Sequence, residues 1–193
     1  DIIILDVEHN KQVGTIRTGL SGVTTPAWNP DGTQLVFTGY DGGLSDLFVV
    51  DRDGKHLRRL TNDKYADLNP SWSPDGKSIA FTTDRGPETN FTTLHFGNYR
   101  LALYHLDTDQ IEILKGMDAG KNADPQWSPD GKSIAYIPDR TGVSHIYLSD
   151  ASSGDCYQIT HFFTRANGFT EPPPALPGPS HAHHLGTRAA PTT

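Results

Sequence analysis

Short apolar runs of strand length recur along the chain, with turn residues between them. In the run at 134–137, Ile134 and Tyr136 fall on one side of a strand, and Ala135 and Ile137 fall on the other. Apolar residues on both sides predict a sheet that is covered on both faces. Each repeat unit holds four such runs and one Pro-Asp-Gly turn, in which proline presets φ and glycine permits the bend. The pattern predicts an all-β protein of four-stranded antiparallel sheets.

Each of these turns belongs to a longer repeat. The heptapeptides PAWNPDG, PSWSPDG and PQWSPDG contain Trp28, Trp72 and Trp127, which are 44 and 55 residues apart. A period near 44 residues, with one lengthened unit, matches the four-stranded blade of a β-propeller. We expect all three indoles to lie in the same kind of seam between neighbouring blades.

The repeat divides the chain into units. The predicted fold is an all-β propeller fragment, open at its ends, with three complete blades, a half blade and a disordered C-terminal tail. The complete blades are 24–61, 68–115 and 123–160. The other segments are 1–18, which matches the last two strands of a blade, 161–176, which resembles the start of another blade, and the Pro-rich 177–193, predicted to be disordered. We expect more blades in the full-length protein, and open blade edges favour self-association.

Two of the units are close copies of each other. Residues 70–84 and 125–140 share the pattern PxWSPDGKSIA, followed after a short run by Asp. This pattern resembles the TolB-like, WD-repeat-like propeller repeat, and residues 26–61 match it more loosely. The resemblance covers about residues 2–160 of the chain.

The resemblance implies a setting as well as a fold. TolB-type propellers are periplasmic and bind protein partners in the cell envelope, which implies a periplasmic or secreted location for this chain. Similar propellers precede the catalytic domain of prolyl-oligopeptidase-like peptidases, where they screen substrates, and others accompany tricorn-like proteases. In none of these proteins does the propeller supply catalytic residues of its own.

Composition and charge exclude several function classes. The formal net charge is −7 and the basic residues are scattered, so we expect no nucleic acid as a partner. No apolar run approaches the roughly 18 residues of a transmembrane helix, so we expect no membrane insertion. Cys156 is the only cysteine, which excludes a disulfide within the chain. The start of the chain reads as a strand rather than as a signal peptide.

The sequence holds no catalytic motif that we recognise. Gly-x-Ser-x-Gly, His-Glu-x-x-His, the P-loop and the dinucleotide fingerprint are all missing, which predicts a protein that is not an enzyme and needs no cofactor. Ser144 and His145 are neighbours on a strand and therefore face opposite sides. The histidines at 181–184 favour a solvated tail over a metal site, and the acidic segment 51–54 favours a hairpin turn over a calcium loop. We therefore expect no metal.

The lengthened unit holds the candidate binding site. Its extra residues, GPETNFTTLHFG, form a long loop between the second and third strands of the 68–115 blade. Long loops in compact domains tend to be functional, and aromatic residues with arginine are typical of interaction surfaces; the alternative is local packing over the blade. Two further arginines follow aspartates after second strands and are either ligand-facing or structural. The candidate binding residues are Arg85, Phe91, His95, Phe96, Tyr99, Arg100 and Arg140.

Three readings of function remain open. The leading one is a non-catalytic scaffold that binds a protein or peptide. The alternative is the propeller part of a larger hydrolase, a prolyl-oligopeptidase-like peptidase or a tricorn-like protease, whose catalytic domain is not in this chain. The third is a structural fragment without present activity.

Overall fold

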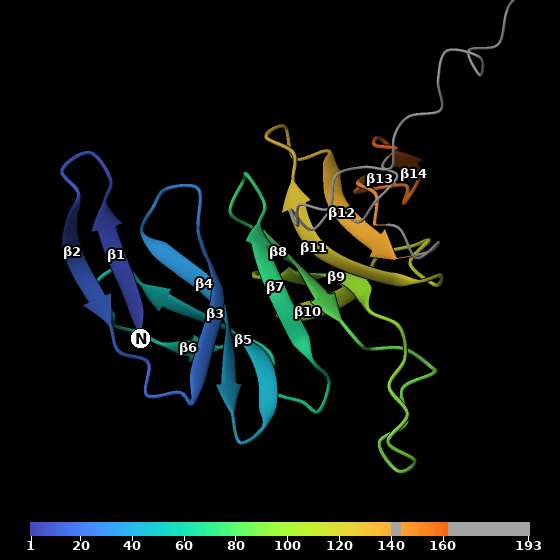
Figure 1. Ribbon diagram of the computed structural model, residues 1–193, viewed down its shortest axis with the longest axis horizontal. Helices are drawn as coiled ribbons and strands as arrows, with labels where there is room; N and C mark the ends of the chain where they lie inside the picture. Colours follow the sequence, from blue (N-terminus) through green and yellow to red (C-terminus); the bar gives the residue numbers. More distant parts are fainter. Residues whose placement is uncertain (140–143, 162–193) are drawn as a thin grey trace, which may run out of the picture.

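The computed structural model describes residues 1–139 and 144–161. These residues form fourteen β-strands and no helix. Strands β1 (Ile2–Asp6) and β2 (Lys11–Ile16) make a two-stranded antiparallel hairpin, and the other twelve strands make three four-stranded antiparallel sheets. The hairpin lies at one end of a row of sheets and the β11–β14 sheet lies at the other end (Figure 1).

Each four-stranded sheet is one blade, with its strands in sequence order. Blade 1 consists of β3 (Gly22–Trp28), β4 (Gln34–Asp41), β5 (Leu44–Asp51) and β6 (Arg58–Arg59). Blade 2 consists of β7 (Asp67–Trp72), β8 (Ser78–Thr83), β9 (Arg100–His105) and β10 (Gln110–Ile113). Blade 3 consists of β11 (Lys121–Trp127), β12 (Ser133–Asp139), β13 (Tyr147–Asp150) and β14 (Cys156–Gln158).

These sheets confirm the predicted fold class, an all-β propeller fragment with three blades and a half blade. Among the described residues the row is open, because the hairpin and blade 3 lie at its two ends (Figure 1). The predicted start of another blade at 161–176, apart from its first residue, and the predicted disordered tail at 177–193 lie outside the described residues.

The Pro-Asp-Gly turns are held by their own side chains. In blade 2 the Ser73 hydroxyl donates a hydrogen bond to the Asp75 carboxylate at 2.6 Å and accepts one from the Ser78 N–H at 2.9 Å. The hydrogen bond from the Ser73 hydroxyl, and after it the one from the Lys77 N–H, lower the pKa of Asp75. Gly76 has a φ of 70°, a conformation that glycine adopts without strain. The turn is therefore a local product of the Ser-Pro-Asp-Gly sequence.

The first strand of every blade has a bulge before its proline. The strand register shifts there, and the residue before each proline has a positive φ: Thr25 at 50°, Asn69 at 53° and Asp124 at 55°. Asn and Asp tolerate this left-handed conformation, whereas a β-branched residue does so only under strain. The three repeats thus share this bulge. In β3 the positive-φ position is occupied by Thr25, a residue that is unfavourable there.

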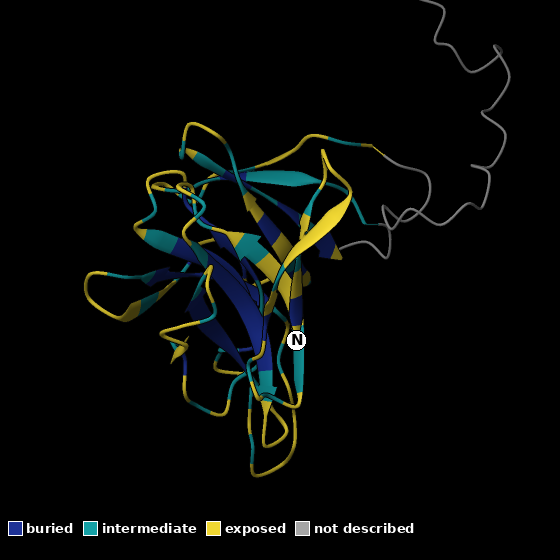
Figure 2. Ribbon diagram, turned by 90° about the vertical axis from the view of Figure 1, so that its left-hand side faces the viewer, coloured by how far each residue is buried: buried dark blue, intermediate teal, exposed yellow. Residues whose placement is uncertain are grey.

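The core consists of three apolar seams between neighbouring sheets. Figure 2 shows buried residues along the middle strands and exposed residues on the loops and on some of the outer strands. The seam between blades 1 and 2 contains Val36, Leu47, Val49, Trp72, Ile79, Phe81, Ala102 and Tyr104. The seam between blades 2 and 3 contains Ala80, Leu101, Leu103, Leu114, Met117, Ile134 and Tyr136. The seam between the hairpin and blade 1 contains Ile2, Ile16, Leu35, Phe37, Phe48 and Val50.

The three tryptophans do not share one environment, so the prediction of equivalent positions is wrong for one of them. Trp72 is 8% exposed inside the first seam, and Trp127 packs half-buried against the second. Trp28 is 42% exposed, beside Leu5 and Val13. Among the described residues, the unit before blade 1 is a two-stranded hairpin, whereas Trp72 lies between two four-stranded sheets.

Coverage of both sheet faces likewise depends on the neighbours. Strand β8 of blade 2 is buried at five successive residues, as predicted for a sheet covered on both sides. In β12 of blade 3, Ile134 and Tyr136 are buried against blade 2, but Ala135 and Ile137 on the other face are only half-buried. The prediction made from residues 134–137 is therefore correct for blade 2, while in blade 3 the described residues bury only one face fully.

Candidate functional site

The long loop of blade 2, residues 84–99, is fastened by its own hydrogen bonds. The Thr89 hydroxyl donates to the Asp84 carbonyl at 2.5 Å and accepts the Gly97 N–H at 3.0 Å, which joins the two ends of the loop. Nearer the tip, Asn90 and His95 exchange backbone hydrogen bonds of 2.7 and 3.0 Å. The loop therefore folds back on itself and projects from the row of blades in a defined shape (Figure 1).

Arg100 anchors this loop from below. Its guanidinium donates two hydrogen bonds, of 3.0 and 2.9 Å, to the Glu88 carboxylate and lies 3.2 Å from the carboxylate of Asp118. At Gly86 a Cβ atom would lie 2.8 Å from Glu88 Oε2 and 3.0 Å from Arg100 Nε, so the chain passes too close to this ion pair for a side chain. Arg100 is only 9% exposed, and its contacts with Glu88 give it a structural role at the base of the loop.

Two aromatic residues of the loop pack together at the surface. The Phe91 ring makes edge contacts with Tyr65 at 5.3 Å and with Phe96 at 6.0 Å between ring centroids. The Lys64 Nζ lies 4.5 Å from the centre of the Phe91 ring, a cation–π contact. Phe96 nevertheless remains 56% exposed. Local packing thus orders Phe91 while leaving an aromatic surface open to solvent.

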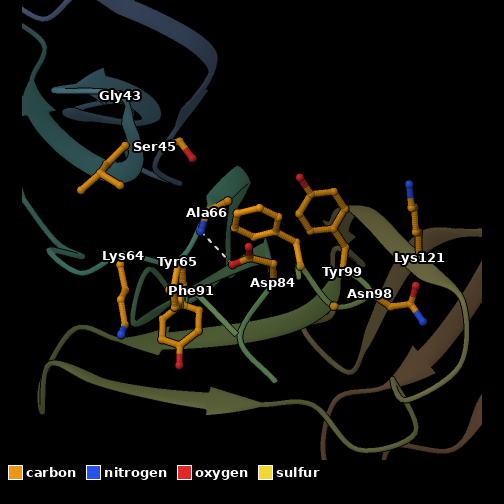
Figure 3. A pocket seen from close by; sticks show the side chains of 13 residues that line it. Gly43, Ser45, Lys64, Tyr65, Ala66, Asp84, Phe91, Asn98, Tyr99 and Lys121 are labelled. Atoms are coloured by element: carbon orange, nitrogen blue, oxygen red, sulfur yellow. Dashed lines mark hydrogen bonds between the residues drawn. The ribbon is translucent and has the colours of Figure 1, made fainter. Parts of the chain in front are cut away.

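These aromatic rings border an open pocket of about 560 Å³ (Figure 3). Its lining residues come from the β4–β5 turn of blade 1, the segment before β7, the long loop, and the first residue of β11. They are Gly43, Leu44, Ser45, Lys64, Tyr65, Ala66, Asp84, Phe91, Phe96, Gly97, Asn98, Tyr99 and Lys121. The pocket therefore lies on one rim of the row and draws on three consecutive blades.

The predicted binding residues divide into three groups. Phe91, Phe96 and Tyr99 line the pocket. Arg85, His95 and Arg100 do not line it, although His95 is exposed on the loop. Arg140 lies outside the described residues.

Arg85 is held by two carboxylates on the blade. Its guanidinium forms an ion pair with Asp63 and a double contact with Asp67, whose second bond is 3.0 Å long. The Asp67 side chain is fully buried and also accepts the Thr83 hydroxyl at 2.7 Å. The structural alternative for Arg85 is therefore the one that its contacts favour.

Asp84, the neighbour of Arg85, was not predicted as a site residue. It lines the pocket yet is only 5% exposed. Its Oδ1 accepts the Ala66 N–H at 2.8 Å (Figure 3), and among the described residues it has no ion-pair partner. Burial raises the pKa of Asp84, and burial together with the nearby Asp84 carboxylate raises the pKa of Tyr99. The sequence signal was the Asp-Arg pair, but the two side chains form no ion pair with each other.

The segments that suggested metal binding show no such geometry where they are described. Residues 51–54 form the turn between β5 and β6, in which the Gly54 N–H bonds to the Asp51 carbonyl at 2.8 Å. Within residues 1–139 and 144–161, no group of three His, Cys, Asp or Glu side chains is close enough to hold a metal ion. The histidines at 181–184 lie outside this part of the chain.

The described residues also include no helix of the length and apolarity needed to cross a membrane.

Comparison with known proteins decides the family. The family model described as the TolB beta propeller domain matches residues 1–100. The chain belongs to this TolB β-propeller family. The Tol-Pal system protein TolB of Desulfotalea psychrophila is 35% identical to it over 132 residues, which are 67% of this chain and 26% of that protein. The chain thus spans about a quarter of the length of this curated TolB relative.

Solved structures agree on the fold. The crystal structure of TolB from Acinetobacter baumannii matches with a TM-score of 0.69 and 22% identity, over 84% of this chain and 38% of that TolB chain. The propeller is shared more widely, because the crystal structure of puromycin hydrolase matches with a TM-score of 0.56 and 23% identity, over 76% of this chain and 23% of that one. At these identities the likeness shows the propeller fold alone.

Proposed function

We propose that this chain is a non-catalytic, TolB-like propeller scaffold that binds a protein or peptide partner through the long loop of blade 2 and its pocket. The observation that carries the proposal is an aromatic surface on an ordered loop: Phe96 is 56% exposed, and Phe91 and Tyr99 border an open pocket. Aromatic side chains supply much of the binding energy at interfaces, and a preformed loop loses little entropy on binding.

The setting is part of the proposal. The relatives' names place them in the Tol-Pal system, which together with the family resemblance supports a periplasmic or secreted location and a protein partner. The net charge of −7 and the scattered basic residues support a partner other than nucleic acid.

A triple substitution tests the proposed surface. Phe91→Ser, Phe96→Ser and Tyr99→Ser in one chain remove the aromatic groups without touching the ion pairs below the loop. The purified wild type and variant are each immobilised and exposed to an envelope extract of the organism that encodes them, and the retained proteins are identified by mass spectrometry. We expect a partner retained by the wild type and lost, about tenfold or more, by the variant.

Two controls give this experiment its meaning. Tyr157→Ser removes an aromatic residue that is 61% exposed on blade 3, away from the pocket, and should leave capture unchanged. Circular dichroism must show the same β-sheet spectrum for all three proteins. Unchanged capture by a correctly folded triple variant refutes the proposed surface.

A second copy of this chain is another partner that exposed apolar residues support. At the hairpin end of the row, Ile3, Leu5 and Val13 are 58%, 61% and 52% exposed. These apolar side chains lie away from the pocket. Self-association through them would therefore persist in the triple variant and can be separated from partner capture.

The rival proposal is the propeller part of a larger hydrolase. Its support is the fold shared with puromycin hydrolase, at an identity that speaks for the fold only. The sequence of the gene around this segment distinguishes the two proposals. A Gly-x-Ser-x-Gly domain encoded in the same reading frame would favour the hydrolase.

A further inference from the structure

Of the three buried carboxylates in the part of the chain that the structure describes, two are paired with arginine and one is not. Asp46 and Asp67 are both fully buried, and they form ion pairs with Arg59 and Arg85, respectively. Asp84 is 5% exposed, but the adjacent guanidinium of Arg85 is taken by Asp67 and a second aspartate. Burying a charge without a partner destabilises the folded state, so the presence of a carboxylate at Asp84 needs an explanation.

The carboxylate of Asp84 belongs to the lining of the pocket. Figure 3 shows it in the middle of the lining residues, between Ala66 and Tyr99. Among the described residues, its hydrogen-bond donors are backbone N–H groups alone. Among residues 1–139 and 144–161, no lysine or arginine forms an ion pair with the side of the carboxylate that meets the pocket.

The neighbours of Asp84 favour a ligand with a positive charge. A neutral ligand would bury the carboxylate further without pairing it, and an anion would be repelled. The rings of Phe91, Phe96 and Tyr99 offer π-faces and apolar edges, which attract both an ammonium or guanidinium group and the methylene stem that carries it.

We infer that the pocket receives a lysine or arginine side chain of the partner polypeptide, with its cationic end at Asp84 and its stem against the aromatic rings. This inference rests on the proposed function, because it names the chemistry that the same surface recognises. It makes Asp84 a specificity residue of the binding site.

Two lysines at the rim narrow the choice of partner. Lys64 and Lys121 lie on opposite sides of Asp84 in Figure 3. Their charges repel a free polyamine, which carries only positive groups. The same charges attract carboxylates, so the best occupant is a basic residue with acidic residues on either side of it in the partner sequence.

The test uses short peptides as probes. The first is acetyl-Gly-Asp-Gly-Lys-Gly-Asp-Gly-amide, and the second has glutamine in place of the lysine. Both are titrated into the full chain, and the carboxyl carbon of Asp84 is followed by NMR as the pH is varied. We expect the lysine peptide alone to lower the pKa of Asp84, because a nearby cation favours the ionised form.

Substitution of Asp84 supplies the second readout. Asp84→Asn keeps an oxygen for the Ala66 N–H but removes the charge, and should weaken binding of the lysine peptide by about tenfold or more. Asp107→Asn makes the same charge change at an exposed position beyond the far end of β9 and should leave binding unchanged. Thermal unfolding checks that both variants fold.

The outcomes separate this inference from the proposed function. Equal binding of the two peptides, or a pKa of Asp84 that does not move, overturns the inference. Tighter binding of spermidine than of the lysine peptide overturns it too, and assigns the pocket to free polyamines. If Asp84→Asn still captures the envelope partner that the aromatic triple variant loses, the inference fails while the proposed function stands. If neither variant loses the partner, the proposed function fails first.

Discussion

Strands β3 and β7 are the first strands of consecutive blades and share the same sequence features, but their tryptophans differ in exposure. Both have a bulge, a positive-φ residue before proline and a terminal tryptophan. In β7 the tryptophan, Trp72, is 8% exposed, whereas in β3 Trp28 is 42% exposed. Strand β7 lies against blade 1, while β3 has only the two-stranded hairpin before it. The comparison teaches that the repeat determines the path of the strand and that the neighbouring unit determines its burial.

The largest expected effect is at Trp72. Trp72→Ala should lower the free energy of unfolding by roughly 3–5 kcal/mol, because it leaves a cavity in the seam between blades 1 and 2. Denaturant unfolding followed by fluorescence or circular dichroism measures the loss. A loss below about 1 kcal/mol would contradict the placement of this indole in the core.

Trp28 is the matched control for that substitution. Trp28→Ala removes the same group from a position that is 42% exposed, so the loss should stay near or below about 1 kcal/mol. Equal losses at the two positions would mean that the difference in burial between β3 and β7 has no energetic consequence.

The next effect concerns an ion pair that β7 has and β3 lacks. Arg85→Gln should cost about 3 kcal/mol at pH 7, because it leaves the fully buried carboxylate of Asp67 without its cation. Burial already raises the pKa of Asp67 to about 6 in the wild type, and loss of the Arg85 cation raises it further. The folded variant then binds the proton more tightly than the folded wild type, so the loss should shrink as the pH falls from 7 through about 6 and should be small at about pH 5.

Urea unfolding at the two pH values measures this difference. Lys77→Gln, at an exposed residue in the same blade, is the control for loss of one positive charge and should change stability by less than about 0.5 kcal/mol. If Arg85→Gln costs less than about 1 kcal/mol at both pH values, Arg85 is not the structural clamp that its contacts indicate.

The smallest expected effect is at the positive-φ residue, where a substitution in β3 should stabilise the protein and the reverse substitution in β7 should destabilise it. Thr25 and Asn69 hold the same left-handed conformation, with φ values of 50° and 53°. Thr25→Asn should stabilise the protein by about 1 kcal/mol, and Asn69→Thr should destabilise it by a similar amount, since asparagine tolerates this conformation and threonine does not. Thermal unfolding of both single variants tests the pair, and a shift of the same sign in both would refute it.

The fold could be predicted because its determinants are local and repeated. The Ser-Pro-Asp-Gly turn closes on itself through Ser73 and Asp75, so its sequence alone indicates the hairpin. Four strand runs between such turns then predict a blade. The exposure of Trp28 could not be predicted in this way, because it depends on contacts with residues outside its own repeat.

The sequence indicated the long loop of the candidate site but not the contacts of its charged residues. The extra length of the 68–115 blade indicated the loop, and Phe91, Phe96 and Tyr99 do line the pocket. The partners of Arg85 could not be read from the sequence, because Asp63 and Asp67 approach it only after the strands pair. For the same reason nothing indicated that Asp84, one residue away, would be left without a cation.

The pocket is assembled from three successive repeats. The β4–β5 turn belongs to blade 1, the loop with Asp84 to blade 2, and Lys121 to blade 3. A ligand bound there contacts three blades, so its affinity depends on the angles between neighbouring sheets. Binding should therefore restrict the movement of the blades relative to one another.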